Sequence, residues 1–239
     1  MALERVQKLI ARSGYCSRRK AEELIDQGKV SVNNIPITLG DKADPVADTV
    51  YVEGKALTYE KKEYFMLHKP KGYITSMSDA YERKTVTELI ETENRVYPVG
   101  RLDRDATGML IMTNDGDFAQ QISHPRSEVS KTYVAILTTT FDEDDLEKLK
   151  RGFRIDSQNV KADQAIMLAD NTVAVNIHVG LNKVVKRLFK ECGYYVKHLH
   201  RTHIGSLALD VLEGEYRPLK EADRKAIFSP LELSKETFS

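Results

Sequence analysis

One stretch of the chain concentrates side chains that can carry out acid–base or nucleophilic chemistry. Residues 100–116 read GRLDRDATGMLIMTNDG, and glycines stand on both sides of Asp103 and Asp105. Glycine favours turns, so Asp103 should lie on a loop that leads into the apolar run behind it. Arg101 and Arg104 flank this carboxylate, and nearby positive charge favours its ionised form. An ionised carboxylate that a loop holds in a cleft can act as a nucleophile or as a base.

The elements around Asp103 follow from local patterns. The run 109–112 is short and apolar, as in a buried strand, and Asn114-Asp115-Gly116 is a turn signal that ends it. Residues 131–137 alternate with β-branched side chains and predict a second strand, which carries Tyr133. A basic helix is predicted over residues 184–192. A rigid strand followed by a loop can hold one side chain firmly in place.

Each of these features also has a purely structural interpretation. An aspartate in a glycine-rich loop often caps a helix or closes a turn, and a single tyrosine in a strand usually belongs to the core. His198, His200 and His203 suggest a zinc site, but on a strand the first two share a face and the third points the other way. Both cysteines lie outside this cluster. We therefore expect no metal.

Composition narrows the class of protein. The chain has 239 residues, 41% hydrophobic and 30% charged, which suits a soluble protein with one large domain or a small and a medium one. It contains two cysteines and no apolar run long enough to cross a membrane, and the N-terminus lacks the apolar core of a secretion signal. We therefore expect a cytoplasmic protein without disulfides.

Charge is balanced overall but unevenly distributed. The chain has 36 basic and 36 acidic residues, which by itself counts slightly against a nucleic-acid-binding protein. Basic residues nevertheless gather within residues 1–29 and again within residues 183–201. Two basic patches on a neutral chain fit a protein that follows a phosphate backbone over part of its surface.

The stretch around Asp103 resembles the signature of the RsuA/RluB family of pseudouridine synthases, G-R-L-D-x-D-T-x-G-L-L-L-x-T-N-D-G. Ala106 departs from it, because the family usually has threonine there. The resemblance implies that Asp103 is the catalytic aspartate. The family's second motif, K-x-Y, places Tyr133 where a tyrosine stacks on the target uracil. In the third motif Lys186 occupies the place of the basic residue that pairs with the catalytic aspartate.

Other parts of the chain extend this resemblance. Arg187 is the alternative partner for Asp103, and Val184 replaces the glutamine usual in the third motif. Residues 3–58 resemble the RNA-binding domain first described in ribosomal protein S-four, and a KPxG turn of the family matches residues 69–72. The implied RNA contacts are Arg5, Arg18, Arg19, Lys20, Lys69, Lys71, Arg101, Arg104, Arg187 and Arg201.

Together these observations predict an α+β protein. We expect a small RNA-binding domain over residues 1–60, a larger domain with a mainly antiparallel sheet over 61–232, and a polar tail over 233–239. The predicted reaction is isomerisation of a uridine in ribosomal RNA, with large-subunit RNA favoured over small-subunit RNA. It requires no cofactor, and the partner is ribosomal RNA or a ribosome assembly intermediate. We expect a monomer. The alternative from another class is a non-catalytic RNA-binding assembly factor.

Overall fold

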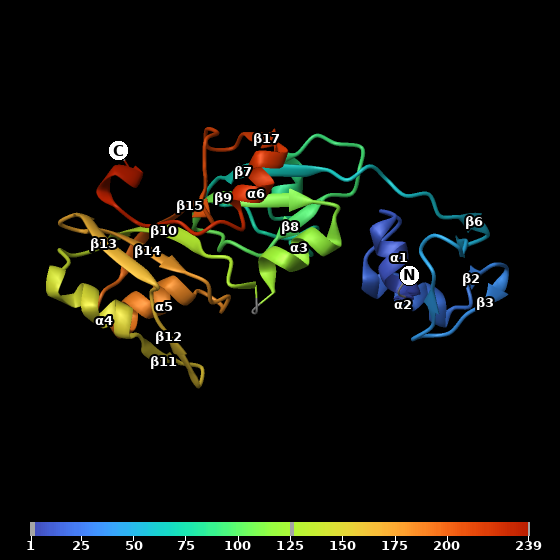
Figure 1. Ribbon diagram of the computed structural model, residues 1–239, viewed down its shortest axis with the longest axis horizontal. Helices are drawn as coiled ribbons and strands as arrows, with labels where there is room; N and C mark the ends of the chain where they lie inside the picture. Colours follow the sequence, from blue (N-terminus) through green and yellow to red (C-terminus); the bar gives the residue numbers. More distant parts are fainter. Residues whose placement is uncertain (1–2, 125–126, 239) are drawn as a thin grey trace. The chain divides into compact units, whose positions relative to one another are not determined.

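The chain folds into two units, which are described separately. A computed structural model describes residues 3–124 and 127–238 (Figure 1). The smaller unit contains the chain up to Glu63 together with Thr92–Val96 and Asn114–Gly116, and the larger unit contains the remainder. The predicted domain boundary at residue 60 lies next to this division, whereas the predicted domain ends at residues 1–2 and 239 lie outside the described residues.

The smaller unit is a pair of helices packed on short strands. Ser17 caps the second helix by accepting a hydrogen bond from the backbone N–H of Lys20 at 3.2 Å. One small core joins the helices to the strands, and it uses residues from Val6 to Leu57 only. The elements are β1 (Glu4–Arg5), α1 (Val6–Arg12), α2 (Arg18–Asp26), β2 (Val30–Val32), β3 (Ile35–Pro36), β4 (Lys42–Ala43), β5 (Val50–Val52) and β6 (Lys55–Ala56).

A mixed sheet organises the larger unit, with its main strands in the order β13-β14-β10-β15-β9-β7-β17. All of its pairings are antiparallel except that of β15 with β9, so the predicted α+β class is confirmed. The strands of the larger unit are β7 (Tyr64–Lys69), β8 (Tyr97–Val99), β9 (Thr107–Thr113), β10 (Lys131–Leu137), β11 (Phe153–Ile155), β12 (Gln158–Val160), β13 (Gln164–Ala169), β14 (Thr172–Ile177), β15 (Val196–Ile204), β16 (Leu207–Ala208) and β17 (Tyr216–Pro218). Of these, β11 and β12 form a separate two-stranded hairpin.

Helices cover the two halves of this sheet (Figure 1). Apolar side chains of α4 and α5 pack with β10, β13 and β14 in one core, and those of α3 and α6 pack with β7 and β9 in another. The helices are α3 (Gly116–Ser123), α4 (Leu146–Arg151), α5 (Val184–Glu191) and α6 (Glu221–Ala226), with short 3₁₀ turns at Val86–Leu89, Glu143–Asp145 and Lys235–Phe238. No helix among the described residues has the length and apolar character to cross a membrane.

The parallel crossing of β9 and β15 sets the geometry of the centre of the sheet. Gly108 of β9 lies opposite Arg201 of β15, with a φ of +111°. A Cβ on Gly108 would lie 2.3 Å from the backbone oxygen of Arg201. Only glycine allows so close an approach of two backbones. Strand β15 therefore presents Arg201 directly beside the loop that precedes β9.

The C-terminal segment folds back onto the large sheet. The side-chain amide of Gln164 in β13 donates to the carbonyl of Leu231 at 2.9 Å and accepts from the N–H of Leu233 at 2.7 Å. Phe238 then packs edge-on against the His203 ring, with centroids 6.0 Å apart. The segment predicted as a polar tail is thus attached to the larger unit by specific contacts.

Candidate active site

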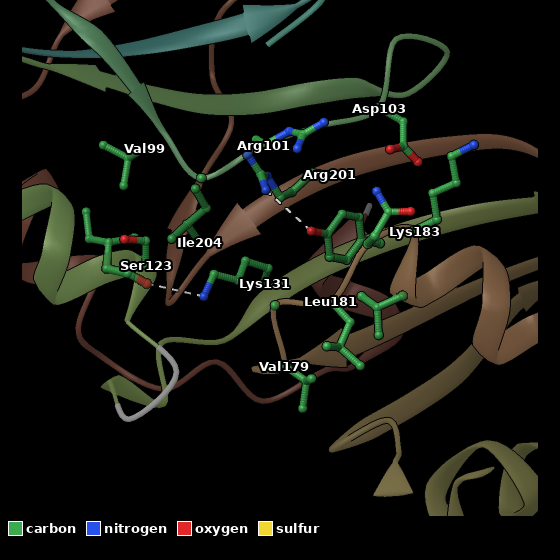
Figure 2. A pocket seen from close by; sticks show the side chains of 16 residues that line it. Val99, Arg101, Asp103, Ser123, Lys131, Val179, Leu181, Lys183, Arg201 and Ile204 are labelled. Atoms are coloured by element: carbon green, nitrogen blue, oxygen red, sulfur yellow. Dashed lines mark hydrogen bonds between the residues drawn. The ribbon is translucent and has the colours of Figure 1, made fainter. Parts of the chain in front are cut away.

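The larger unit contains an open cavity of about 300 Å³ on one side of the β9–β15 crossing. Five segments contribute polar side chains to it: the loop before β9, the end of α3 with Ser123, strand β10, strand β15 and the turn before α5 (Figure 2). Its charged and aromatic side chains are Arg101, Asp103, Lys131, Tyr133, Lys183 and Arg201. A cavity of this size can accept a group as large as a small ligand.

Asp103 is held by its backbone while its carboxylate faces the cavity. The Ala106 N–H donates to the Asp103 carbonyl at 3.1 Å, which closes the turn after it. The hydroxyl of Thr75 bonds both the carbonyl (2.8 Å) and the N–H (3.2 Å) of the neighbouring Leu102. Among the described residues, no side chain hydrogen-bonds the Asp103 carboxylate, which points into the cavity on the same side as Lys183 (Figure 2). The structure thus presents a fixed carboxylate with its oxygens available to a substrate.

Lys69 stabilises this loop from beneath. Its side chain is fully buried, and its ammonium donates to the carbonyls of Ala106 (2.8 Å) and Pro70 (3.1 Å). Burial lowers the pKa of Lys69 to about 8, although Asp105 and Asp103 oppose that shift. The prediction that Lys69 contacts RNA is wrong, because a side chain with no exposed surface cannot reach a partner.

Tyr133 and Arg201 form one buried pair at the wall of the cavity. Arg201 Nη1 donates to the Tyr133 hydroxyl at 3.3 Å, and Arg201 Nε donates to the Met109 carbonyl at 2.6 Å. Arg201 is only 3% exposed. As a predicted RNA contact it can therefore meet only a nucleotide that has entered the cavity, and a phosphate on the surface is out of its reach.

Lys131 is a cavity residue that the sequence analysis missed. Its ammonium donates to the carbonyls of Val129 (2.5 Å) and Ile122 (3.4 Å). Burial, followed by the neighbouring charge of Arg201, lowers the pKa of Lys131 to about 8. The signal was present, because Lys131 lies two residues before Tyr133 on one strand and so shares its face.

Helix α5 contacts the loop before β9 differently from what was predicted. Lys186 donates to Asp105 at 2.6 Å and not to Asp103, and the Lys186 hydrogen bond lowers the pKa of Asp105. Arg187, the alternative partner, makes two hydrogen bonds to Asp156 at the tip of the β11–β12 hairpin, at 2.5 and 2.7 Å. Both predicted pairings with Asp103 are therefore wrong in this structure, because each cation already has another carboxylate.

The remaining predicted RNA contacts lie at the surface of their own units. Lys71, Arg101 and Arg104 are exposed in the larger unit, where Arg104 Nε donates to the carbonyl of Gly72 at 3.2 Å. The exposed cations of the smaller unit are Arg5, Arg18, Arg19 and Lys20. Exposure leaves these seven side chains accessible to phosphates, and their role as RNA contacts stays a prediction.

A second, smaller cavity of about 60 Å³ adjoins the first and shares Asp103 and Tyr133 with it. Arg101 and Lys183 also line both cavities, whereas the residues that line only the smaller one are the apolar Leu102, Ala106, Val185 and Leu199. The two cavities meet at Asp103 and Tyr133, and Arg101 and Lys183 also lie at this junction. The apolar side chains found only in the smaller cavity suit a flat, weakly polar ring.

The fold and this site define an enzyme that acts on a nucleotide, since a cation-lined cavity, an available carboxylate and an aromatic wall occur together. Comparison with known proteins identifies the class. Residues 63–204 match the RNA pseudouridylate synthase family, and residues 4–50 match the S4 domain. The chain belongs to the RNA pseudouridylate synthase family, and it is an isomerase of that class. The resemblance inferred from the sequence motifs is thereby confirmed.

Individual relatives match along nearly the whole chain. The ribosomal large subunit pseudouridine synthase B of Bacillus subtilis (strain 168) is 38% identical over 99% of this chain and 100% of its own length. An RNA pseudouridine synthase of Aquifex aeolicus (strain VF5), described as uncharacterized, is 37% identical over 96% of this chain and 95% of its own. A crystal structure of a pseudouridylate synthase superposes with a TM-score of 0.69 at 31% identity, covering 93% of this chain and 99% of that chain.

Proposed function

We propose that this protein converts a specific uridine of large-subunit ribosomal RNA into pseudouridine, with Asp103 as the catalytic carboxylate. The single observation that carries the role of Asp103 is its position. It lies where the two cavities meet, beside Tyr133, and it makes no side-chain hydrogen bond to the described residues. The choice of RNA rests on the full-length similarity to the Bacillus subtilis large-subunit enzyme.

The reaction determines what the site must do. The bond from the ribose C1′ to N1 of uracil breaks, a new bond forms from C1′ to C5, and a proton leaves C5 while N1 gains one. Nothing is oxidised or transferred to another molecule, so we propose that no cofactor takes part. Because a base inside a helix is inaccessible, the uridine must first leave its stack. The Tyr133 ring then supports the displaced uracil, while Asp103 engages the nucleotide.

Binding of folded RNA is assigned to cations outside this cavity. Arg5, Arg18, Arg19 and Lys20 belong to the unit that contains the S4 domain, and all are exposed. Contacts of this kind position an enzyme on its RNA without reading the sequence. We propose that the protein acts in the cytoplasm, as a monomer, on ribosomal RNA or on an assembly intermediate.

The rival functions are distinguished by specific observations. A non-catalytic assembly factor would need no carboxylate at the junction of two cavities, and the family match argues against it. Action on small-subunit RNA remains the alternative target. Mapping carbodiimide-modified pseudouridines by primer extension in a deletion strain distinguishes the two subunits, and loss of a small-subunit pseudouridine would contradict the proposed target.

The catalytic role is tested by comparing two neighbouring carboxylates. Asp103→Asn should abolish tritium release from ribosomal RNA labelled at C5 of uridine while RNA binding persists. Asp105→Asn is the matched control, because it neutralises a carboxylate on the same loop that lies 60% exposed and pairs with Lys186. Its turnover should stay within about tenfold of the wild type, since exposed pairs contribute little. Turnover by the Asp103→Asn protein would refute the assignment.

A further inference from the structure

Arg201 carries an unsatisfied hydrogen-bond donor at the wall of the larger cavity. Its Nε and Nη1 have partners in Met109 and Tyr133, but Nη2 is buried without a partner among the described residues. A buried guanidinium N–H without an acceptor is costly, so such a group in a native site calls for a ligand. The cavity that Arg201 lines provides the space for one.

Lys131 provides a second positive charge next to it. Lys131 and Arg201 come from the neighbouring strands β10 and β15, and both line the same cavity (Figure 2). An ammonium has three donors, and two of those of Lys131 bond the carbonyls of Val129 and Ile122. Among the described residues the third has no protein acceptor. Lys131 can therefore donate to a ligand without leaving its present position.

The charges of the cavity wall are not balanced. Its lining includes four cationic side chains, Arg101, Lys131, Lys183 and Arg201, and Asp103 is the one acidic side chain among the described residues that line it. Asp103 has no hydrogen bond to Lys131 or Arg201. The influences on the pKa of Lys131 are burial and Arg201, which both disfavour its charged form. Arg201 is buried and Lys131 is half-buried, and neither has a hydrogen bond to a carboxylate among the described residues, so an anion would stabilise both.

We propose that Lys131 and Arg201 bind a phosphodiester group of the substrate RNA, next to the uridine that enters the site. This inference rests on the proposed function. RNA carries one negative charge per nucleotide, and that charge lies on the phosphate. A uracil carbonyl can accept hydrogen bonds, but it is neutral and cannot balance two cations. Arginine and lysine are also the side chains that bind phosphates most readily in proteins.

This assignment fixes the direction in which the nucleotide lies. The phosphate occupies the larger cavity, which Lys131 and Arg201 line, and the uracil occupies the smaller cavity beside Leu102 and Leu199. The ribose then crosses the junction where Asp103 and Tyr133 line both cavities. The two cations act as binding residues that set the distance between Asp103 and the sugar, and they take no part in bond breaking.

The test combines a change in the RNA with a change in the enzyme. The substrate is an RNA hairpin containing the mapped uridine, with a neutral methylphosphonate placed 5′ or 3′ of that uridine. At one of the two positions, kcat/KM of the wild type should fall roughly 10- to 100-fold, the range expected for a charge-assisted hydrogen bond. Lys131→Met should lower kcat/KM on normal RNA by a similar factor. Lys131→Arg should restore most of it.

The decisive measurement is whether the two losses combine. If Lys131 contacts the phosphate, the kcat/KM of Lys131→Met should be little lower on the methylphosphonate RNA than on normal RNA, because one partner of the contact is already absent. Lys190→Met, which removes an exposed charge from the last turn of α5, should instead retain the full sensitivity to the neutral linkage. The phosphate site would be refuted if the neutral linkage lowered the kcat/KM of Lys131→Met by as large a factor as that of the wild type. It would also be refuted if neither linkage lowered the kcat/KM of the wild type. Either result would favour a uracil carbonyl as the ligand.

Failure of the proposed function gives a different result. If the wild type releases no tritium from the unmodified hairpin or from ribosomal RNA, then the proposed reaction is wrong. If turnover is normal and independent of the neutral linkage, only the phosphate site is wrong.

Discussion

Replacing Gly108 by alanine should destabilise the larger unit more than any other change of equal size near Asp103. The new Cβ would lie 2.3 Å from the oxygen and 2.5 Å from the nitrogen of the Arg201 backbone. Ordinary contact requires about 3.5 Å, so β9 and β15 would have to separate by roughly 1 Å. This overpacking costs about 1–3 kcal/mol, and a non-glycine residue at a φ of +111° costs about 1–3 kcal/mol more.

Two other glycines separate these costs. Gly100 has a φ of +73°, but a Cβ added there would meet nothing within 4 Å, so Gly100→Ala carries the backbone cost alone. Gly180 has neither a strained φ nor a neighbour within 4 Å, so Gly180→Ala should change the free energy of unfolding by less than about 0.5 kcal/mol. Urea unfolding with equal m-values gives the three free energies.

The free energy of unfolding should be lowest for Gly108→Ala, clearly higher for Gly100→Ala, and close to the wild-type value for Gly180→Ala. The Gly108→Ala protein should unfold about 2–6 kcal/mol more easily, a large part of the stability of an ordinary domain. It should also lose activity at temperatures where it stays folded, because a shift of about 1 Å at a reacting centre costs about 100-fold in rate. Equal destabilisation of Gly108→Ala and Gly100→Ala would show that the close approach to Arg201 does not matter.

Three further predictions concern single side chains. Tyr133→Phe keeps the ring but removes the hydroxyl that accepts a hydrogen bond from Arg201 at 3.3 Å. Tritium release should therefore fall less in Tyr133→Phe than in Tyr133→Ala. A larger fall in Tyr133→Phe would contradict a supporting role for the ring. The kcat/KM of the wild type should fall as pH rises through about 8, where Lys131 loses its proton, and Lys131→Arg should remove this fall. Lys69 also has a pKa of about 8, but its amine can donate to its two carbonyls in either protonation state, so its titration should not affect activity. A fall in kcat/KM near pH 8 that persists unchanged in Lys131→Arg would therefore contradict the role of Lys131. The Arg217 hydrogen bond lowers the pKa of Asp223 below its ordinary 3.8, so the ionised carboxylate stabilises the fold above that pH and this stabilisation is lost as pH falls. The free energy of unfolding in urea should be higher for the wild type than for Arg217→Met, and this difference should shrink between about pH 5 and pH 2.

The sequence predicted the structure of the loop around Asp103 well because its signals are local. Glycines, a turn and a short apolar run surround Asp103, and each acts within a few residues. The alternation of residues 131–137 likewise predicted β10, which carries Tyr133. Neither conclusion required knowledge of which strands pair.

What could not be predicted depends on pairing between distant segments. Lys69 looked like part of an exposed basic turn, but β7 pairs with β9 so that Lys69 lies opposite Gly108, inside the sheet. Lys186 was assigned to Asp103 from its place in the family's third motif, and the sequence does not show which of two carboxylates, separated by a single residue, faces α5. The structure pairs it with Asp105.

The crossing of β9 and β15 also bears on synthesis of the chain. The residues it joins, such as Met109 and Arg201, lie 92 positions apart. The smaller unit has a core that ends at Leu57, so it can fold soon after it leaves the ribosome. The proposed reaction centre can form only after translation has passed β15. If the proposed function holds, a nascent chain can therefore bind RNA long before it can modify it.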